Sequence, residues 1–191
     1  IINKIKIMNK KTIIISTLLV ITLGILGRIL PHPWNFTPIV AIALFSSVYF
    51  SFRYGLAIFL VTMILSDVFI GFYEWQIMLA VYASFGVTCL IGYLVRQKKN
   101  IFTIIGGSLS GSILFYFLTN WAVWQFGTMY AKTFSGLMQS YTLALPFFKN
   151  MLLGDLFYTG LLFGLYELFV HYYKREELNN KILIGVNTHK K

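Results

Sequence analysis

Ionisable and amide side chains are scarce in this 191-residue sequence, and most of those outside its basic ends stand within or beside long apolar runs. In hydrocarbon such a group is costly unless it is paired or faces a cavity, so each one is a candidate for function. An arginine can bind a carboxylate, an aspartate can receive a cationic or hydroxyl group, and an asparagine amide needs hydrogen-bond partners. The candidate ligand-binding residues are Arg28, Asn35, Asp67, Asn120, Trp124, Asn150 and Asp155.

The same inventory gives little support to catalysis or metal binding. The 3 histidines and 1 cysteine have no metal-ligand spacing, and there is no phosphate-binding loop or nucleophile elbow. Asp67 and Asp155 meet only the minimal requirement of a catalytic carboxylate pair, which is two acids at one depth. We therefore expect no enzyme activity, no metal and no cofactor.

The composition indicates a protein whose main solvent is lipid. Hydrophobic residues make up 58% of the chain and charged residues only 12%, too few to cover the surface of a soluble domain of this size. The net charge of +10 would suit nucleic acid only if the basic residues gathered on one soluble face. They stand between apolar runs instead, so the expected partner is a lipid bilayer and not nucleic acid.

Six apolar runs are predicted as transmembrane helices, since a bilayer core needs about 20 residues of helix. The predicted fold class is all-α, a polytopic bundle of about six spans that forms a single membrane domain over residues 12–173. Residues 1–11 and 174–191 are its basic cytoplasmic ends. The predicted spans are Thr12 to Leu30, Pro38 to Phe52, Tyr54 to Phe72, Trp75 to Val95, Ile101 to Phe126 and Asn150 to Tyr173.

The distribution of lysine and arginine predicts the orientation of these spans. If the spans alternate, almost all basic residues fall on one side, and only Arg28, Lys132 and Lys149 fall on the other. Cytoplasmic loops hold the excess of basic residues, so both termini are expected inside. The first run reaches Leu30 without a small-residue cleavage pattern, which favours a retained span over a signal peptide. We expect a multi-pass protein of a bacterial inner membrane.

The segment between the first two spans, PHPWNFTP, predicts a cavity on the outer side. Thr37 is expected to cap the second helix and Pro38 to occupy its first turn. From Pro38 to Arg53 a helix rises only about 24 Å, against about 30 Å of hydrocarbon. The helix should therefore begin below the outer surface, where irregular backbone is tolerated only if it lines a cavity or is buried. Its first amides would carry partial positive charge into that cavity.

The long outer connection contains an amphipathic segment, 132–145, predicted as a short helix that ends at Pro146. It could cover the cavity as a lid or rest in the headgroups as an anchor. Its apolar residues at helical spacing are Phe134, Leu137, Met138, Tyr141 and Leu145.

Each of these features also has a structural interpretation. Arg28 could form an ion pair with Asp67 or Asp155 that only fixes helix positions. Tryptophans such as Trp124 are common interface anchors, and buried asparagines can serve as interhelical hydrogen-bond partners. The polar set would then hold helices together in a scaffold or assembly partner.

Three motifs carry a resemblance to a known family: RILPHPWNFTPIVAIALF, SDVFIG and PFFKNMLLGDLFYTGLLFG. With them the chain resembles an uncharacterised family of bacterial inner-membrane proteins. More distantly, it is similar to the substrate-binding S components of energy-coupling factor transporters. That resemblance implies six helices, cytoplasmic termini, an outward-facing small-molecule pocket and a separate ATPase or coupling subunit. The resulting hypothesis is a membrane component that binds a small, partly anionic molecule and takes it up.

Overall fold

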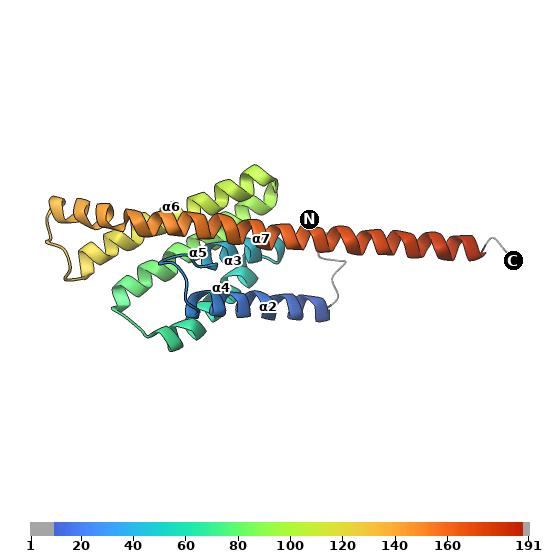
Figure 1. Ribbon diagram of the computed structural model, residues 1–191, viewed down its shortest axis with the longest axis horizontal. Helices are drawn as coiled ribbons and strands as arrows, with labels where there is room; N and C mark the ends of the chain where they lie inside the picture. Colours follow the sequence, from blue (N-terminus) through green and yellow to red (C-terminus); the bar gives the residue numbers. More distant parts are fainter. Residues whose placement is uncertain (1–9, 189–191) are drawn as a thin grey trace.

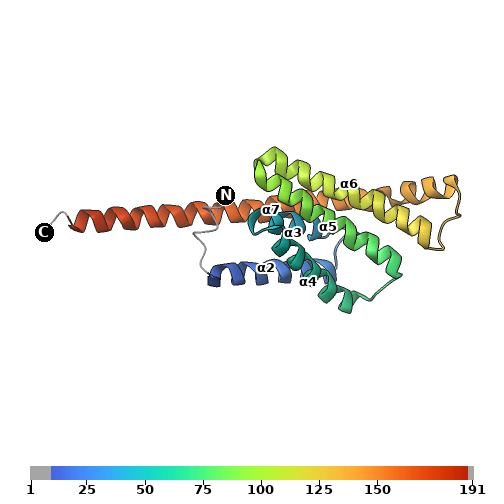
Figure 2. The same cartoon turned by 180° about the vertical axis from the view of Figure 1, so that it is seen from behind.

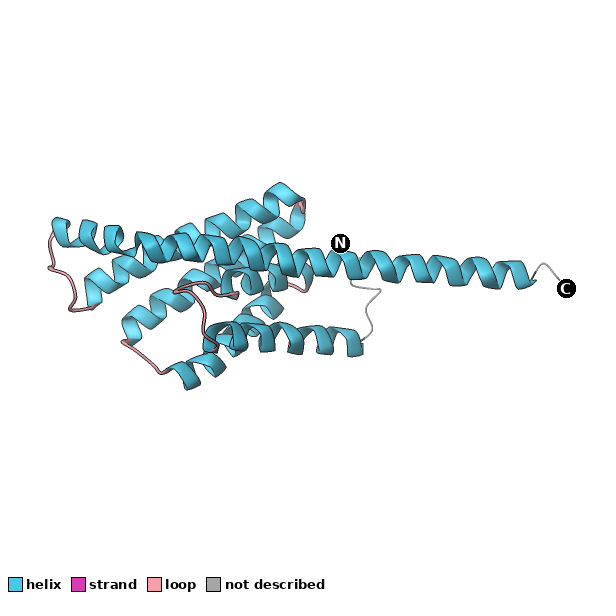
Figure 3. Ribbon diagram, in the orientation of Figure 1, coloured by secondary structure: helices cyan, strands magenta, loops and turns pink. Residues whose placement is uncertain are grey.

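The computed structural model describes residues 10–188, and within them it contains six helices and no strand (Figures 1 and 3). The predicted all-α fold class is confirmed. Five of the six predicted spans coincide with helices to within a few residues, and the sixth lies inside a much longer one. The helices are α2 (Lys10–Ile29), α3 (Ile39–Tyr49), α4 (Phe52–Ile70), α5 (Trp75–Gln97), α6 (Ile101–Phe126) and α7 (Phe134–Thr188).

Four helices are long and apolar enough to cross a membrane: α4, α5, α6 and the part of α7 over Phe134–Tyr173. The two other apolar helices are shorter, Ile13–Ile29 within α2 and Ile39–Tyr49 in α3. The 11 residues of α3 rise about 16 Å as a helix, which is roughly half of a bilayer core. Helix α3 is shorter than predicted, so other parts of the chain must fill the space beyond both of its ends.

Helix α3 occupies the middle of the bundle, and every one of its residues is buried. It packs against α2, α4, α5, α6 and α7, and Figures 1 and 2 show it enclosed from opposite sides. A helix that is apolar all round is stable only where neighbours cover all of its faces. The sequence IVAIALFSSVY has no charged residue to place at a surface, which is why this segment forms the core.

Glycines let the surrounding helices approach α3 closely. A Cβ added to Gly92 of α5 would lie 2.8 Å from the carbonyl oxygen of Leu44, and one added to Gly55 of α4 would collide with Ser47. Backbone atoms cannot move aside as a flexible side chain can. Small residues at helix interfaces have this role in membrane proteins generally, because close packing there replaces the hydrophobic effect.

Replacing Gly92 with alanine is therefore expected to destabilise the bundle by about 1–3 kcal/mol, the usual cost of overpacking. The control is Gly106→Ala, because nothing lies within 4 Å of a Cβ added at Gly106. Thermal unfolding of the purified proteins in detergent checks this. Equal melting temperatures for the two variants would contradict the close packing of α5 on α3.

The residues before α3 form an irregular segment, 30–38, that runs alongside α7. The rings of Trp34 and Phe147 are 6.0 Å apart, and Phe36 lies 5.6 Å from Tyr158. Phe36 also contacts Gly154. Two aromatic residues of α7, Phe147 and Tyr158, thus pack against a segment that has no regular secondary structure.

The predicted cap of α3 is wrong in detail. The helix begins at Ile39, Pro38 stands at the N-cap position, and no side chain caps the helix there. The first helical hydrogen bond runs from the amide of Ile42 to the carbonyl of Pro38. The turn before it uses Asn35 at φ 62°, in the left-handed region that asparagine tolerates better than most residues. This turn, rather than a hydroxyl cap at Thr37, sets the direction of α3.

Helix α7 corrects the predicted outer segment, because Pro146 lies inside a helix of 55 residues and does not end it. Proline removes one N–H, and membrane helices tolerate that loss where neighbours support the chain. The carbonyl that loses its helical donor is that of Thr142. The adjacent turn is held on α6 by two bonds: the Tyr116 hydroxyl donates to the Tyr141 carbonyl at 2.7 Å, and the Tyr141 hydroxyl donates to the Phe117 carbonyl at 3.1 Å. Residues 134–145 are thus the outer end of α7, packed on α6, and form no separate lid or anchor helix.

The other end of α7 extends far beyond the bundle, past the end where α2 begins (Figures 1 and 2). The predicted tail, 174–191, is therefore helical as far as Thr188.

Candidate functional site

Arg28, Asp67 and Tyr82 form a buried cluster that joins α2, α4 and α5. The Arg28 guanidinium lies 2.7 Å from Oδ1 of Asp67 and donates a hydrogen bond of 2.5 Å to the Ser66 hydroxyl. The Tyr82 hydroxyl donates to the other Asp67 oxygen at 2.7 Å. Asp67 is completely buried. Both of its oxygens are engaged, so this cluster favours the structural interpretation of the Arg28 ion pair.

Removing one partner of this pair is expected to be severe, because it leaves a charge buried without a counterion. Asp67→Ala should lower the free energy of unfolding by about 3–5 kcal/mol, with a parallel loss of protein from the membrane. The double variant Arg28→Leu with Asp67→Leu should regain most of that loss, because no uncompensated charge remains. Western blots of membranes and thermal unfolding measure both; a single variant as stable as the wild type would exclude a structural role.

Asp155 belongs to a second cluster, between α6 and α7, and it is 1% exposed. The Ser112 hydroxyl donates to its Oδ2 at 2.6 Å, and one turn away the Thr159 hydroxyl donates to Ser108 at 3.1 Å. Among residues 10–188 no lysine or arginine pairs with Asp155. Asp67 and Asp155 thus have different partners on different helices, and they do not form the carboxylate pair that a hydrolytic site would need.

Two of the predicted residues, Asn35 and Asn120, line a hollow at the end of the bundle where α6 ends and α7 begins, which we call the outer hollow after the side predicted for it. Its volume is about 290 Å³. It lies between the irregular segment 30–38, α6 and the outer part of α7. The residues that line it are Trp34, Asn35, Phe115, Tyr116, Thr119, Asn120, Val123, Ala144, Phe147, Phe148 and Met151.

The outer hollow offers unused amide groups beside aromatic rings. The Asn120 side chain donates from Nδ2 to the Tyr116 carbonyl at 2.8 Å, and its Oδ1 has no partner within residues 10–188. The side chain of Asn35 likewise makes no hydrogen bond to the described part of the chain. The rings of Tyr116 and Phe148 lie 4.4 Å apart. Such a site can hydrogen-bond to a flat molecule and stack against it.

No charged side chain lines the outer hollow, and the first residues of α3 do not line it either. The expected contribution of Arg28 and the α3 amides to an anion site is therefore not supported by the geometry. Arg28 is occupied by Asp67, and Ile39 and Val40 are covered by their neighbours. The chemistry of the lining suits an uncharged ligand.

The two remaining predicted residues lie outside the lining. Trp124 donates from Nε1 to the Ala131 carbonyl at 2.9 Å, and Lys132 donates to the carbonyls of Trp124 and Gly127. These bonds close the connection between α6 and α7. Asn150 is half-buried on α7 and has no hydrogen-bond partner for its side chain among the described residues. The structure thus divides the seven candidates among separate places.

A polar cluster at the opposite end was missed from the sequence. The Tyr49 hydroxyl donates to Glu167 at 2.6 Å, Lys99 forms an ion pair with Glu167, and Lys99 also donates to Tyr49 at 3.0 Å. The sequence held a signal, because Glu167 is an acidic residue within the predicted span Asn150 to Tyr173 and Lys99 lies in the short basic connection before the predicted span Ile101 to Phe126. The cluster connects α3, α7 and the turn between α5 and α6.

Residues 7–178, which include all seven candidate ligand-binding residues, match one protein family. It is DUF6580, described as a family of unknown function. No curated protein and no solved structure matches the chain.

Proposed function

We propose, from the premise that this chain belongs to the DUF6580 family, that it is a small-molecule binding and uptake component of the bacterial inner membrane. The observation that carries the proposal is the outer hollow, where Asn35 and Asn120 present unpaired amide groups beside aromatic rings. Asn120 is half-buried, and a polar atom without a partner at such a position, like its Oδ1, is unusual in a membrane bundle; Asn35 is exposed. A ligand that hydrogen-bonds to them would satisfy both.

A six-span arrangement with both termini in the cytoplasm is part of this proposal. It is supported by the four long apolar helices, by the burial of α3 and by the position of the basic residues. Lys10 and the basic turn at Arg96, Lys98 and Lys99 belong to the connections that alternate with the outer ones. Cytoplasmic loops carry that excess of basic charge.

The orientation predicts which engineered cysteines can be reached from outside intact cells. Thr128→Cys, in the connection between α6 and α7, should react with a membrane-impermeant maleimide, whereas Lys98→Cys should react only after permeabilisation. The native Cys89 is 0% exposed and should remain unlabelled. The reverse pattern of labelling would overturn the proposed topology while leaving the helical bundle intact.

The proposed ligand is small, neutral and flat. A volume of about 290 Å³ is at the lower limit of ligand pockets, which begin at about 300 Å³. The amide groups of Asn35 and Asn120 can pair with the donors and acceptors of a heterocycle, while Tyr116 and Phe148 offer ring surfaces. This revises the partly anionic ligand expected from the sequence.

Uptake would require an energy source outside this chain. The sequence has no phosphate-binding loop, so we propose that a separate ATPase or coupling subunit supplies the energy. The distant resemblance to energy-coupling factor S components implies the same arrangement, in which one subunit binds the solute and a separate subunit supplies the energy.

A thermal-shift screen of purified protein against nucleobases, vitamins and small acids tests ligand binding. Neutral heterocycles should raise the melting temperature, because a ligand that binds only the folded state stabilises it. Asn120→Leu should abolish the shift. Asn150→Leu is the matched control, since Asn150 does not line the hollow, and it should retain the shift. A shift that survives Asn120→Leu and disappears in Asn150→Leu would place the ligand elsewhere.

A non-catalytic scaffold is the second candidate, and the internally satisfied clusters favour it. Arg28 with Asp67, and Lys99 with Glu167, form ion pairs within the chain that connect helices. If the polar residues only hold helices together, Asn120→Leu should reduce abundance and no compound should shift the melting temperature.

A further inference from the structure

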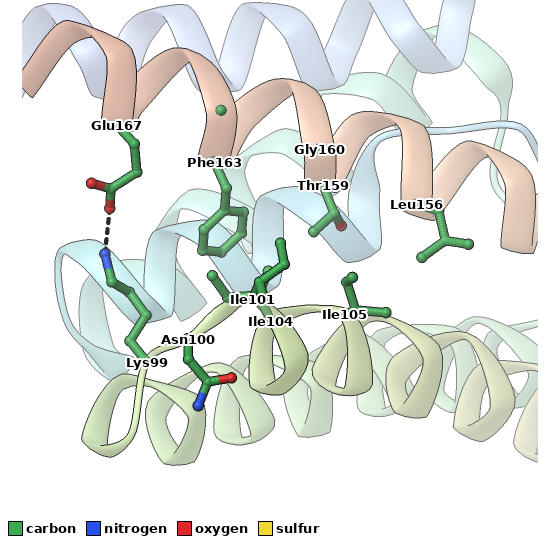
Figure 4. Close-up of a pocket in the computed structure, with 11 residues that line it drawn as sticks. Lys99, Asn100, Ile101, Ile104, Ile105, Leu156, Thr159, Gly160, Phe163 and Glu167 are labelled. Atoms are coloured by element: carbon green, nitrogen blue, oxygen red, sulfur yellow. Dashed lines mark hydrogen bonds and ion pairs between the residues drawn. The ribbon is translucent and has the colours of Figure 1, made fainter. Parts of the chain in front are cut away.

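A second and larger hollow lies between α6 and α7, toward the end of the bundle where α6 begins, and we call it the α6–α7 groove (Figure 4). Its volume is about 660 Å³. Figure 4 shows isoleucines of α6 on one wall, facing the side chains of α7. The residues that line it are Lys99, Asn100, Ile101, Ile104, Ile105, Leu156, Thr159, Gly160, Phe163, Gly164 and Glu167.

The wall formed by α7 includes two glycines that no other part of the chain covers. Gly160 and Gly164 are one helical turn apart, and nothing lies within 4 Å of a Cβ added to either. Gly92, which packs on α3, differs in this respect. Two small residues thus lie where no other helix packs against α7. The groove is open between α7 and Ile101, which is 61% exposed.

The interior of the groove has little to offer a soluble ligand. Its one polar side chain away from the end is Thr159, whose hydroxyl donates to Ser108. The rest of the walls are aliphatic or aromatic. An occupant of this interior must therefore be an apolar chain, because a polar one would lose its hydrogen bonds to water without replacement.

One end of the groove is polar and positively charged. Lys99 and Asn100 form that end, and the Lys99–Glu167 ion pair spans it (Figure 4). Lys98, the preceding residue of the same turn, is exposed and lines a separate hollow between α5 and α6, and its ammonium group has no partner within residues 10–188. With Arg96, the turn carries three positive charges against the single negative charge of Glu167. An apolar trough that ends at a basic turn is complementary to an anionic amphiphile.

We propose that the α6–α7 groove binds one acyl chain of an anionic phospholipid from the cytoplasmic leaflet, with the phosphate beside Lys98 and Lys99. The inference rests on the proposed membrane orientation, which places the basic turn at the cytoplasmic surface. Gly160 and Gly164 leave room for the chain. The net positive charge selects an anionic headgroup over a zwitterionic one.

Native mass spectrometry of the full chain, released from micelles that contain phosphatidylglycerol or phosphatidylcholine with the same acyl chains, tests this. The wild type should retain one phosphatidylglycerol at collision energies that strip other adducts, and about tenfold less phosphatidylcholine. Gly160→Leu should fill the groove and reduce that retention about tenfold. Gly106→Leu, at a glycine equally open but outside this groove, should retain the lipid as the wild type does.

Equal retention of the two lipids by the wild type would overturn the headgroup assignment and, with it, the proposal. That comparison uses only the wild-type protein, so it tests the headgroup assignment even if the Gly160→Leu variant cannot be purified. Undiminished retention by a folded Gly160→Leu would overturn the position of the acyl chain. Failure here leaves heterocycle binding and the Thr128→Cys labelling unaffected, whereas a reversed labelling pattern removes the premise of a cytoplasmic headgroup site.

Discussion

The fold depends on enclosing a helix that is too short to cross a bilayer together with the irregular segment that precedes it. Helix α3 has 11 residues, and backbone outside regular structure cannot face hydrocarbon. The chain meets this constraint from two directions. Glycines on α4 and α5 bring those helices onto α3, and aromatic residues of α7 pack against Phe36 and one edge of Trp34, which stays 76% exposed. The outer hollow is the space that remains where this covering is incomplete.

The polar residues contribute to this enclosure in different ways. Arg28 and Asp67 join α2 to α4, and Asp155 joins α7 to α6 through Ser112. At the opposite end, Lys99 and Glu167 connect the α5–α6 turn to α7. Each cluster satisfies its charges or hydrogen bonds within the chain, whereas Oδ1 of Asn120 and the side chain of Asn35 have no partner among the described residues. Ser46 and Asn150 also lack side-chain partners there. The hollow that Asn35 and Asn120 line, and not the missing partners alone, therefore locates the proposed ligand.

Much of the helical layout could be predicted from the sequence, because apolar runs of about 20 residues have few alternative structures in a membrane. The shortness of the helix after Pro38 also followed from its rise per residue. The predicted stop at Pro146 was wrong, since α7 continues through the proline while the turn before it is held on α6 by the bond between Tyr116 and Tyr141.

The lateral arrangement of the polar residues could not be predicted. A helix that is apolar on every face shows no periodicity that tells which side meets a neighbour and which meets lipid. Depth could be estimated for Arg28, Asp67 and Asp155, but not that the first two pair while the third contacts α6. For the same reason, the sequence could not show that Gly160 and Gly164 would remain uncovered while Gly92 packs against α3.

The most direct test of a solvent-accessible outer hollow is the accessibility of a spin label at Asn35. With Cys89 replaced by serine, a nitroxide on Asn35→Cys in proteoliposomes should collide more often with a polar nickel chelate than with oxygen. A label on Phe117→Cys, on the exposed side of α6, should show the opposite preference. If the label at position 35 collided with oxygen as preferentially as the label at position 117 does, the irregular segment would face lipid and there would be no outer binding site.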